Sequence, residues 1–541
     1  MPAELVLEEK AVKNRAVALR RLGYGMWLAA IAGFALLHAW HLGADFPNGS
    51  PWISDWAKYT DEGWYGNAAI RAHLFGNWYL TGDFNPAVAV PVWPFLEWLL
   101  FFLTGVTVEA ARGLAVAFFF LNLVLSYLLL RKSGPRWMAL AAVTMAVASP
   151  FLYCFSRLAI LEPLQTTLIL AAMNLAVRLP AMRRPVWASA WIGLLFALAV
   201  LTKTTGLFLL PAVLWMVVVP LREQRKTALR SAAAVAAAAA AAYGAWMALI
   251  AGLGLLGDYK YYFFINTYAK PPEFGWQLVA FWWSFHGLFW IDRNLIALAW
   301  LIVVAAALCW RMAWARELWR NPLFGASLLA VAGYVLFMTL QDHPQPRYFA
   351  VPAFFCFFVV ALGVAALLGQ KRQRSWLRRL GWAAAGAALL SVGADGAQTI
   401  AYAAHPQYTW ANAATQLAMY MDTHPNGKRL LTSISADQIA LLAHVPGLCD
   451  DFSQPDLGSK LDRYRPGWYA TWNDLDPNSL NDLHTRYSVE QVASFTALDD
   501  PDRNLLVLFK LHPLPGGQVR DETEQNLKIA LPGDRIDIPI E

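Results

Sequence analysis

Two adjacent acidic residues, Asp61 and Glu62, stand in the aromatic stretch "KYTDEGWYGNAAIRAHLFGNWYLTGD", which runs from Lys58 to Asp83. A carboxylate can accept a proton from an attacking hydroxyl group. The stretch follows the first apolar segment and holds no run long enough to cross a bilayer. We therefore treat the two carboxylates as candidate catalytic groups in a loop outside the hydrocarbon.

Three more ionisable residues stand at the ends of distant apolar runs. Glu162 opens one run, Lys203 closes another, and Arg347 precedes a third. Arg and Lys are suited to binding phosphate. Ionisable groups at the end of a membrane bundle are functional candidates, because placing a charge beside lipid is costly.

The composition is typical of a membrane protein. Of the 541 residues, 58% are hydrophobic and 15% are charged, whereas soluble proteins carry about 25% charged residues. The four cysteines form no CxxC pair and no cluster with zinc spacing. The composition therefore argues against a disulfide framework and against a structural zinc site.

Apolar runs between residues 24 and 400 predict a polytopic α-helical membrane protein with about 11–13 transmembrane helices. A cytoplasmic amphipathic segment is expected over 1–23, and the first span is expected to be retained. The eleven predicted spans are 24–42, 113–130, 137–155, 164–179, 186–202, 207–220, 232–256, 292–310, 323–340, 349–369 and 381–400. Segment 90–105 has two prolines and Glu97, which suits an interfacial helix in the outer loop 43–112. The alternative is an ordinary span paired with another that was missed.

Basic residues alternate between the connectors of these spans. Five short connectors are rich in Lys and Arg: 131–136, 182–184, 221–230, 311–320 and 371–380. The positive-inside rule places them in the cytoplasm together with the N-terminus. The candidate residues then share the opposite side, and we expect a multi-pass protein of the cell inner (cytoplasmic) membrane.

After residue 400 the composition changes to short strand and helix patterns separated by Pro, Gly, Asn and Asp. These patterns predict a soluble α/β domain over 401–541. An odd number of spans precedes it, so it is expected to be extracytoplasmic. The membrane catalytic domain is expected to cover 24–400.

One reaction needs three features together, namely sugar transfer from a polyprenyl-phosphate carrier to a hydroxyl acceptor. It needs a carboxylate base, cations for the anionic leaving group and an apolar groove for the lipid tail. No nucleic acid is expected as a partner. The acceptor could be protein, lipid or glycan, and the sequence does not identify the sugar.

Four elements in order resemble the GT-C glycosyltransferases, especially the protein O-mannosyltransferases and the lipid A aminoarabinose transferases. They are "DEG-x-Y" after the first span, "ASPFLYCFSRLAILEPLQTTLILAA" (148–172), "LTKTTGLFLLPAV" (201–213) and "HPQPRYFAVPAFF" (343–355). The resemblance covers about 1–370.

The resemblance implies roles for individual residues. Asp61 would be the base, and Glu62 would orient the acceptor or support Asp61. Glu162 stands where relatives commonly have Asp, so its longer side chain leaves its role open. The candidates for the donor phosphate are Arg347, Lys203 and Arg157, and those for the sugar are Trp64, Tyr65, His343 and Tyr348. Such a site would invert the anomeric carbon. No metal ligand set is assigned and no metal is obligatory, although the carboxylates could bind a divalent ion.

Simpler interpretations stand beside these roles. Asp61 could cap a helix, Glu162 could be a first-turn residue favoured by the helix dipole, and Lys203 could extend to the headgroups. Aromatic residues also anchor membrane proteins at the interface. For the whole chain, the alternatives are a transporter or flippase of lipid-linked sugars, a non-catalytic receptor and an oligosaccharyltransferase.

Overall fold

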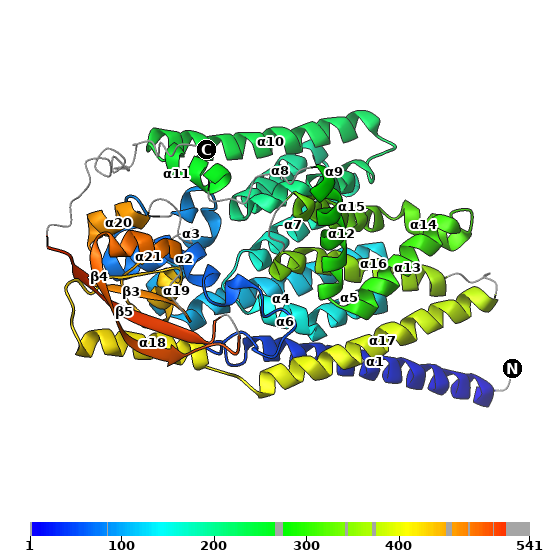
Figure 1. Ribbon diagram of the computed structural model, residues 1–541. Helices are drawn as coiled ribbons and strands as arrows, with labels where there is room; N and C mark the ends of the chain where they lie inside the picture. The colour runs from blue at the N-terminus through cyan, green and yellow to red at the C-terminus, as the bar shows by residue number, and fades with distance from the viewer. Residues whose placement is uncertain are drawn as a thin grey trace.

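The computed structural model describes residues 3–83, 85–265, 274–340, 345–369, 375–450, 457–473, 477–500 and 503–515. Long helices form a bundle, and a small sheet with short helices lies at one end of it (Figure 1). The bundle helices are α1 (Ala3–Ala39), α4 (Val108–Ser133), α5 (Arg136–Ala148), α6 (Pro150–Ser156), α7 (Glu162–Ala176), α8 (Pro185–Thr202), α9 (Leu210–Val218), α10 (Arg225–Gly252), α12 (Phe274–Gly287), α13 (Arg293–Leu308), α14 (Ala313–Arg320), α15 (Pro322–Thr339), α16 (Ala350–Gly369) and α17 (Ser375–Ala404).

The burial of these helices follows their sequence. Helix α16 is apolar on all sides, and nearly all of its side chains are buried, as expected for a helix surrounded by others. Helices α1 and α10 bury only a small share of their apolar windows and lie at the periphery. The core of the bundle therefore forms around α16, and the outer helices present apolar side chains to lipid.

The chain is a multi-pass membrane protein. Within the described ranges, six helices are long and apolar enough to cross a membrane, or eight if each bent pair is one span. The bent pairs are α5 with α6, at 65°, and the segment Gly275–Trp290 with α13, at 116°. Every predicted span overlaps a helix, but several of these helices are too short to cross alone. Helix α12 lies between the predicted spans 232–256 and 292–310 and was not predicted.

The structure shows helices in two other predicted segments, the interfacial segment 90–105 and the N-terminal segment. Segment 90–105 contains α3 (Val92–Thr104), whose 13 residues reach about 20 Å, less than the hydrocarbon thickness of about 30 Å. Helix α1 continues without a break through residue 24, the predicted start of the first span. The N-terminal segment is thus a helical extension of that span.

Within the ranges that the structure describes, the connecting segments contain ten shorter elements. They are η1 (Trp56–Lys58), α2 (Asp61–Phe75), η2 (Pro86–Val88), α3 (Val92–Thr104), η3 (Leu179–Ala181), η4 (Thr204–Leu209), α11 (Leu256–Lys260), η5 (Tyr261–Ile265), η6 (Leu288–Trp290) and η7 (Pro346–Phe349). Helix α2 has both acidic residues in its first turn, where the helix dipole favours negative charge. It ends at Phe75 and is capped by Gly76, whose φ of 83° suits a residue without a side chain.

The C-terminal elements form a mixed sheet. Its strand order is β2-β1-β3-β5-β4, with β1 parallel to β2 and β3, and β5 antiparallel to β3 and β4. Trp468, Ala470 and Trp472 of β3 pack with α18 and α19, while Tyr469 packs with α20 and α21 on the other face. The elements are α18 (Thr409–Thr423), β1 (Leu431–Ser433), α19 (Ala436–Ala443), β2 (Gly447–Cys449), α20 (Leu457–Tyr464), β3 (Trp468–Trp472), α21 (Pro477–His484), β4 (Tyr487–Thr496) and β5 (Leu505–Pro513).

The sheet lies at the end of the bundle opposite the basic connectors. Figure 1 shows the start of α1, the start of α17 and helix α14 far from the strands. The basic connectors and the C-terminal sheet, which are predicted on opposite sides of the membrane, therefore lie at opposite ends of the molecule.

Candidate functional site

Helix α2 places Asp61 at its first position, and Asp61 is buried. Its Oδ1 accepts a hydrogen bond from the hydroxyl of the preceding residue, Thr60, at 2.8 Å. Its Oδ2 lies 2.8 Å from Nη2 of Arg347. Burial raises the pKa of Asp61 above its usual range, and the positive charge of Arg347 opposes part of that rise. The carboxyl group thus has a higher proton affinity than an exposed aspartate.

Arg347 joins two carboxylates of the outer loop. It lies in η7, directly before α16, and its Nη1 donates to Oδ1 of Asp55 at 2.6 Å. The backbone N–H of Arg347 donates to the other oxygen of Asp55 at 2.8 Å. Asp55 is fully buried. Arg347 is therefore shared between Asp55 and Asp61, and these two carboxylates outnumber it.

Lys203 and Glu162 form a second ion pair beside the first. Lys203 follows the last residue of α8, and Glu162 is the first residue of α7. The ring of Tyr348 lies 4.3 Å from Nζ of Lys203 and 4.9 Å from Cζ of Arg347, so both cations contact one aromatic face or edge. The structure thus brings together four of the predicted site residues, namely Asp61, Glu162, Lys203 and Arg347, on the ring of a fifth.

Among the residues that the structure describes, three buried polar atoms of this cluster have no hydrogen-bond partner. They are Oδ2 of Asp61, which has only its ion pair with Arg347, Oε2 of Glu162 and Nε of Arg347. Buried polar atoms are nearly always paired. These atoms are therefore natural contacts for a polar substrate. Within the same ranges, no group of three or more His, Cys, Asp or Glu side chains is placed to hold a metal ion.

Aromatic side chains surround Asp61. The ring of Trp64 stacks on Tyr262 with centroids 6.3 Å apart and an interplanar angle of 19°, and it tilts against Tyr65 at 5.0 Å. Burial, with the Asp61 carboxylate nearby, raises the pKa of Tyr65 well above its usual range. Both predicted sugar-contacting residues of α2 thus lie beside the carboxylate cluster.

Glu62 has very different surroundings from Asp61. Nε of Arg112 donates to its Oε1 and Nη2 to its Oε2, each at 2.6 Å. The N–H of Ala159 donates to Oε1 at 2.9 Å, and Nε2 of Gln438 donates to Oε2 at 3.0 Å. Four donors thus bind the two oxygens of this fully buried carboxylate. Their geometry favours a structural role for Glu62 rather than contact with an acceptor.

The C-terminal unit contacts α2 at the same turn. The N–H of Gly63 donates to Oε1 of Gln438 at 2.7 Å. A Cβ at position 63 would lie 2.2 Å from the carbonyl group of Asp437, so only glycine permits this approach of α19. The helix that carries Asp61 is therefore held from the membrane side by Arg112 and from the sheet side by Gln438.

One predicted site residue lies apart from the cluster, and another lies outside the described residues. Arg157 donates to the hydroxyl of Tyr153 and to the carbonyls of Trp40 and His41, at the end of α1. None of these partners belongs to the Asp61 cluster. His343 lies outside the described residues, and its placement beside the sugar stays a prediction.

Sequence reasoning missed several residues of the site. Asp55, Arg112, Gln438 and Tyr262 all contact the candidate residues, yet none was singled out. For Asp55 a signal existed, because it is another carboxylate of the same outer loop, six residues before Asp61. For Arg112 and Gln438 no local pattern indicates the partner.

The fold is similar to that of ArnT, the lipid A aminoarabinose transferase, from Cupriavidus metallidurans. The crystal structure of ArnT bound to undecaprenyl phosphate gives a TM-score of 0.57 at 13% identity, covering 90% of this chain and 98% of that one. The apo structure gives 0.53 at 14% identity with the same coverage. No family model and no curated protein matches the sequence. The similarity confirms the predicted fold class, a polytopic α-helical bundle with a small C-terminal sheet.

Proposed function

We propose that this chain is an integral membrane glycosyltransferase. It transfers a sugar from a polyprenyl-phosphate donor to a hydroxyl acceptor on the extracytoplasmic face of the inner membrane. The observation that carries the proposal is the buried Asp61–Arg347 pair beside Lys203 and Glu162, in a chain with the ArnT fold. ArnT of C. metallidurans binds undecaprenyl phosphate, and we assign a donor of that chemical class to this chain.

In the proposed reaction, Asp61 takes the proton of the acceptor hydroxyl while the oxygen of that hydroxyl bonds to the anomeric carbon. The bond between that carbon and the phosphate oxygen breaks from the opposite face, so the anomeric configuration inverts. The leaving group is polyprenyl phosphate, and Arg347 and Lys203 stabilise its added negative charge. Trp64 and Tyr65 provide flat apolar surface for the sugar ring. This scheme assigns no step to a metal ion.

Several observations support this assignment of roles. The raised pKa of Asp61 increases its strength as a base. The Tyr348 ring holds the two cations close together, as a phosphate group with several oxygens requires. Glu162 is paired through Oε1 to Lys203, so it positions that cation and presents Oε2 to the donor sugar.

The test is transfer by the purified full-length protein in lipid vesicles, supplied with polyprenyl-phosphate sugars carrying labelled head groups. Release of free polyprenyl phosphate by the wild type, and its loss in Asp61→Asn, supports the proposal. The matched control is Asp422→Asn, since Asp422 is an exposed aspartate of α18 that also pairs with an arginine.

A different result would overturn the proposal. If the vesicles consume no donor, yet a lipid-linked sugar binds to the protein or crosses the bilayer, the chain is a transporter and Asp61 is a binding group. If chelation with EDTA abolishes transfer and Mg²⁺ restores it, the metal-free scheme is wrong while the enzyme class stands.

A further inference from the structure

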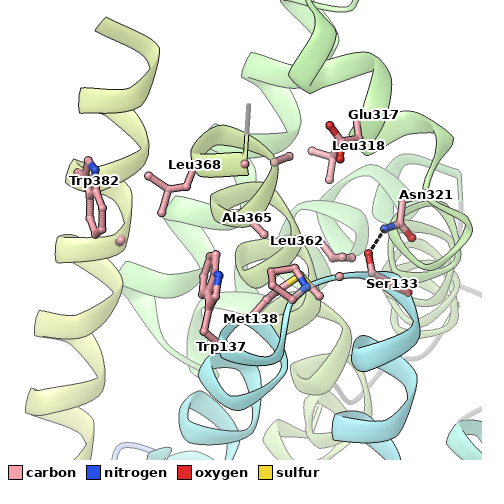
Figure 2. A pocket seen from close by; sticks show the side chains of 15 residues that line it. Ser133, Trp137, Met138, Glu317, Leu318, Asn321, Leu362, Ala365, Leu368 and Trp382 are labelled. Carbon is pink, nitrogen blue, oxygen red and sulfur yellow. Dashed lines mark hydrogen bonds between the residues drawn. The ribbon is translucent and has the colours of Figure 1, made fainter. Parts of the chain in front are cut away.

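A pair of adjoining cavities lies at the basic end of the bundle, far from the Asp61 cluster. The apolar cavity, about 620 Å³, is lined mainly by Trp137, Met138, Leu318, Leu362, Leu368 and Trp382. Figure 2 shows these side chains on α5, α16, α17 and the segment containing Glu317 and Asn321, arranged around one space. The cavity is wide and hydrophobic enough to hold part of an acyl chain.

The second cavity carries positive charge. This cationic cavity, about 650 Å³, is lined by Lys132, Arg316, Arg320 and Glu317 together with small and apolar residues. Lys132 is in the last turn of α4, while Arg316 and Arg320 are one turn apart on the exposed face of α14. Three cations outnumber the one carboxylate, so the lining favours an anion.

The two cavities share part of their walls. Ser133, Glu317 and Asn321 line both, and Nδ2 of Asn321 donates to the backbone oxygen of Ser133 at 3.5 Å (Figure 2). A single molecule with an anionic head and an apolar tail can therefore occupy both at once. The short helix α14 buries Trp314, Ala315 and Leu318 and exposes its arginines, as interfacial helices do.

We propose that these cavities bind an anionic glycerophospholipid of the surrounding bilayer. Its phosphate contacts Lys132, Arg316 and Arg320, and one acyl chain enters the apolar cavity beside Trp137 and Leu362. The charge of the lining selects an anionic head over a zwitterionic one. The apolar cavity selects a lipid over free phosphate. The site lies at the end of the bundle opposite the reaction centre and takes no part in transfer.

The test uses the full-length protein and phosphatidylglycerol in a phosphatidylcholine background. Native mass spectrometry counts retained phosphatidylglycerol, and thermal unfolding in the same vesicles reports stabilisation. The wild type is expected to retain one phosphatidylglycerol and to unfold at a higher temperature as its fraction rises. The variant K132Q/R316Q/R320Q should bind it at least about tenfold more weakly, since each basic residue near an anionic headgroup adds to the attraction.

A matched control removes three exposed arginines of another basic connector, as R222Q/R225Q/R230Q. Equal loss in the control and the cavity variant would mean general surface attraction and would overturn the proposal. Equal retention of phosphatidylcholine, or binding of glycerol phosphate without its chains, would also overturn it. If the triple variant does not fold, Arg320→Gln and Ala365→Phe test the two cavities separately. Each should weaken phosphatidylglycerol retention, and unchanged retention in both contradicts the site.

Discussion

Asp61 and Glu62 are neighbours on one helical turn, and both are buried, yet their surroundings differ. Both oxygens of Glu62 are filled by four donors, and its charge is matched one to one by Arg112. Asp61 has the Thr60 hydroxyl and a share of Arg347, which also binds Asp55. One carboxylate is neutralised fully and the other only in part.

This difference separates a structural carboxylate from a reactive one. A carboxylate with its own cation and all of its hydrogen bonds fixes the backbone around it. A buried carboxylate that shares its cation has a higher proton affinity, as a general base requires. Adjacent positions in a sequence motif therefore need not have related roles. Substitutions at the two residues should therefore separate catalysis from stability.

The largest effect is expected from Asp61→Asn. The substitution keeps the shape and removes the proton acceptor, so transfer should fall by about a hundred- to ten-thousand-fold, the usual contribution of a general base. The thermal unfolding temperature should stay close to that of the wild type. A variant that loses activity only because it unfolds would remove the contrast with Glu62.

For Glu62→Gln the expected loss is in stability. The change leaves Arg112 buried without its counter-charge, which costs about 3–5 kcal/mol when one partner of a buried pair is removed. Unfolding in detergent, followed by heat or denaturant, measures it, and Glu223→Gln at an exposed site is the control. If the variant unfolds like the wild type but loses transfer, Glu62 has a direct catalytic role instead.

Arg347→Lys tests the cation that Asp61 shares with Asp55. Lysine keeps the charge but cannot bind Asp55, Asp61 and a phosphate with one planar group. We expect the KM for the donor to rise about tenfold, in line with the loss of one charge-assisted hydrogen bond, while the KM for the acceptor changes little. An equal rise in both constants would contradict a phosphate role.

The pH dependence tests the difference in proton affinity. Asp61 acts as a base only when ionised, and burial raises its pKa above the usual aspartate range. As the pH falls through that raised pKa, the fraction of carboxylate decreases and kcat/KM should fall with it. The acid limb should therefore lie above the pH at which an exposed aspartate titrates, near 4. A limb at or below that pH would show that burial does not tune this group.

The sequence predicted the charged cluster better than its internal pairing. Glu162, Lys203 and Arg347 are far apart in the chain, but each stands at the outer end of an apolar run, and ends of helices on one side of a bundle converge. The pairing of Arg347 with Asp55 as well as Asp61 depends on tertiary packing, which leaves no periodic signal. Arg157 shows the same limit, because its position near a helix end does not determine which way its guanidinium points.

For the fold, too, the positions of the helices were predictable and their packing was not. Hydrophobic runs predicted where the helices lie, because burial in lipid requires apolar side chains throughout a span. The bends and the short helices were not predicted, since a helix such as α7 needs only enough apolar residues to pack inside the bundle. The contact between α19 and α2 rests on one glycine and one glutamine, and neither residue has a distinctive local pattern.

The smallest effect is expected from Gln438→Ala, which tests the hold of the sheet on α2. The variant removes the donor to Glu62 and the acceptor for the Gly63 N–H. Glu62 keeps Arg112 and Ala159, so the loss of stability should be about 1–2 kcal/mol, near the net value of the two hydrogen bonds removed. Amide exchange of α2 should accelerate while that of α16 does not. The control is Gln398→Ala, an exposed glutamine that also donates a hydrogen bond, and equal changes in both variants would mean that α19 does not hold the helix of Asp61.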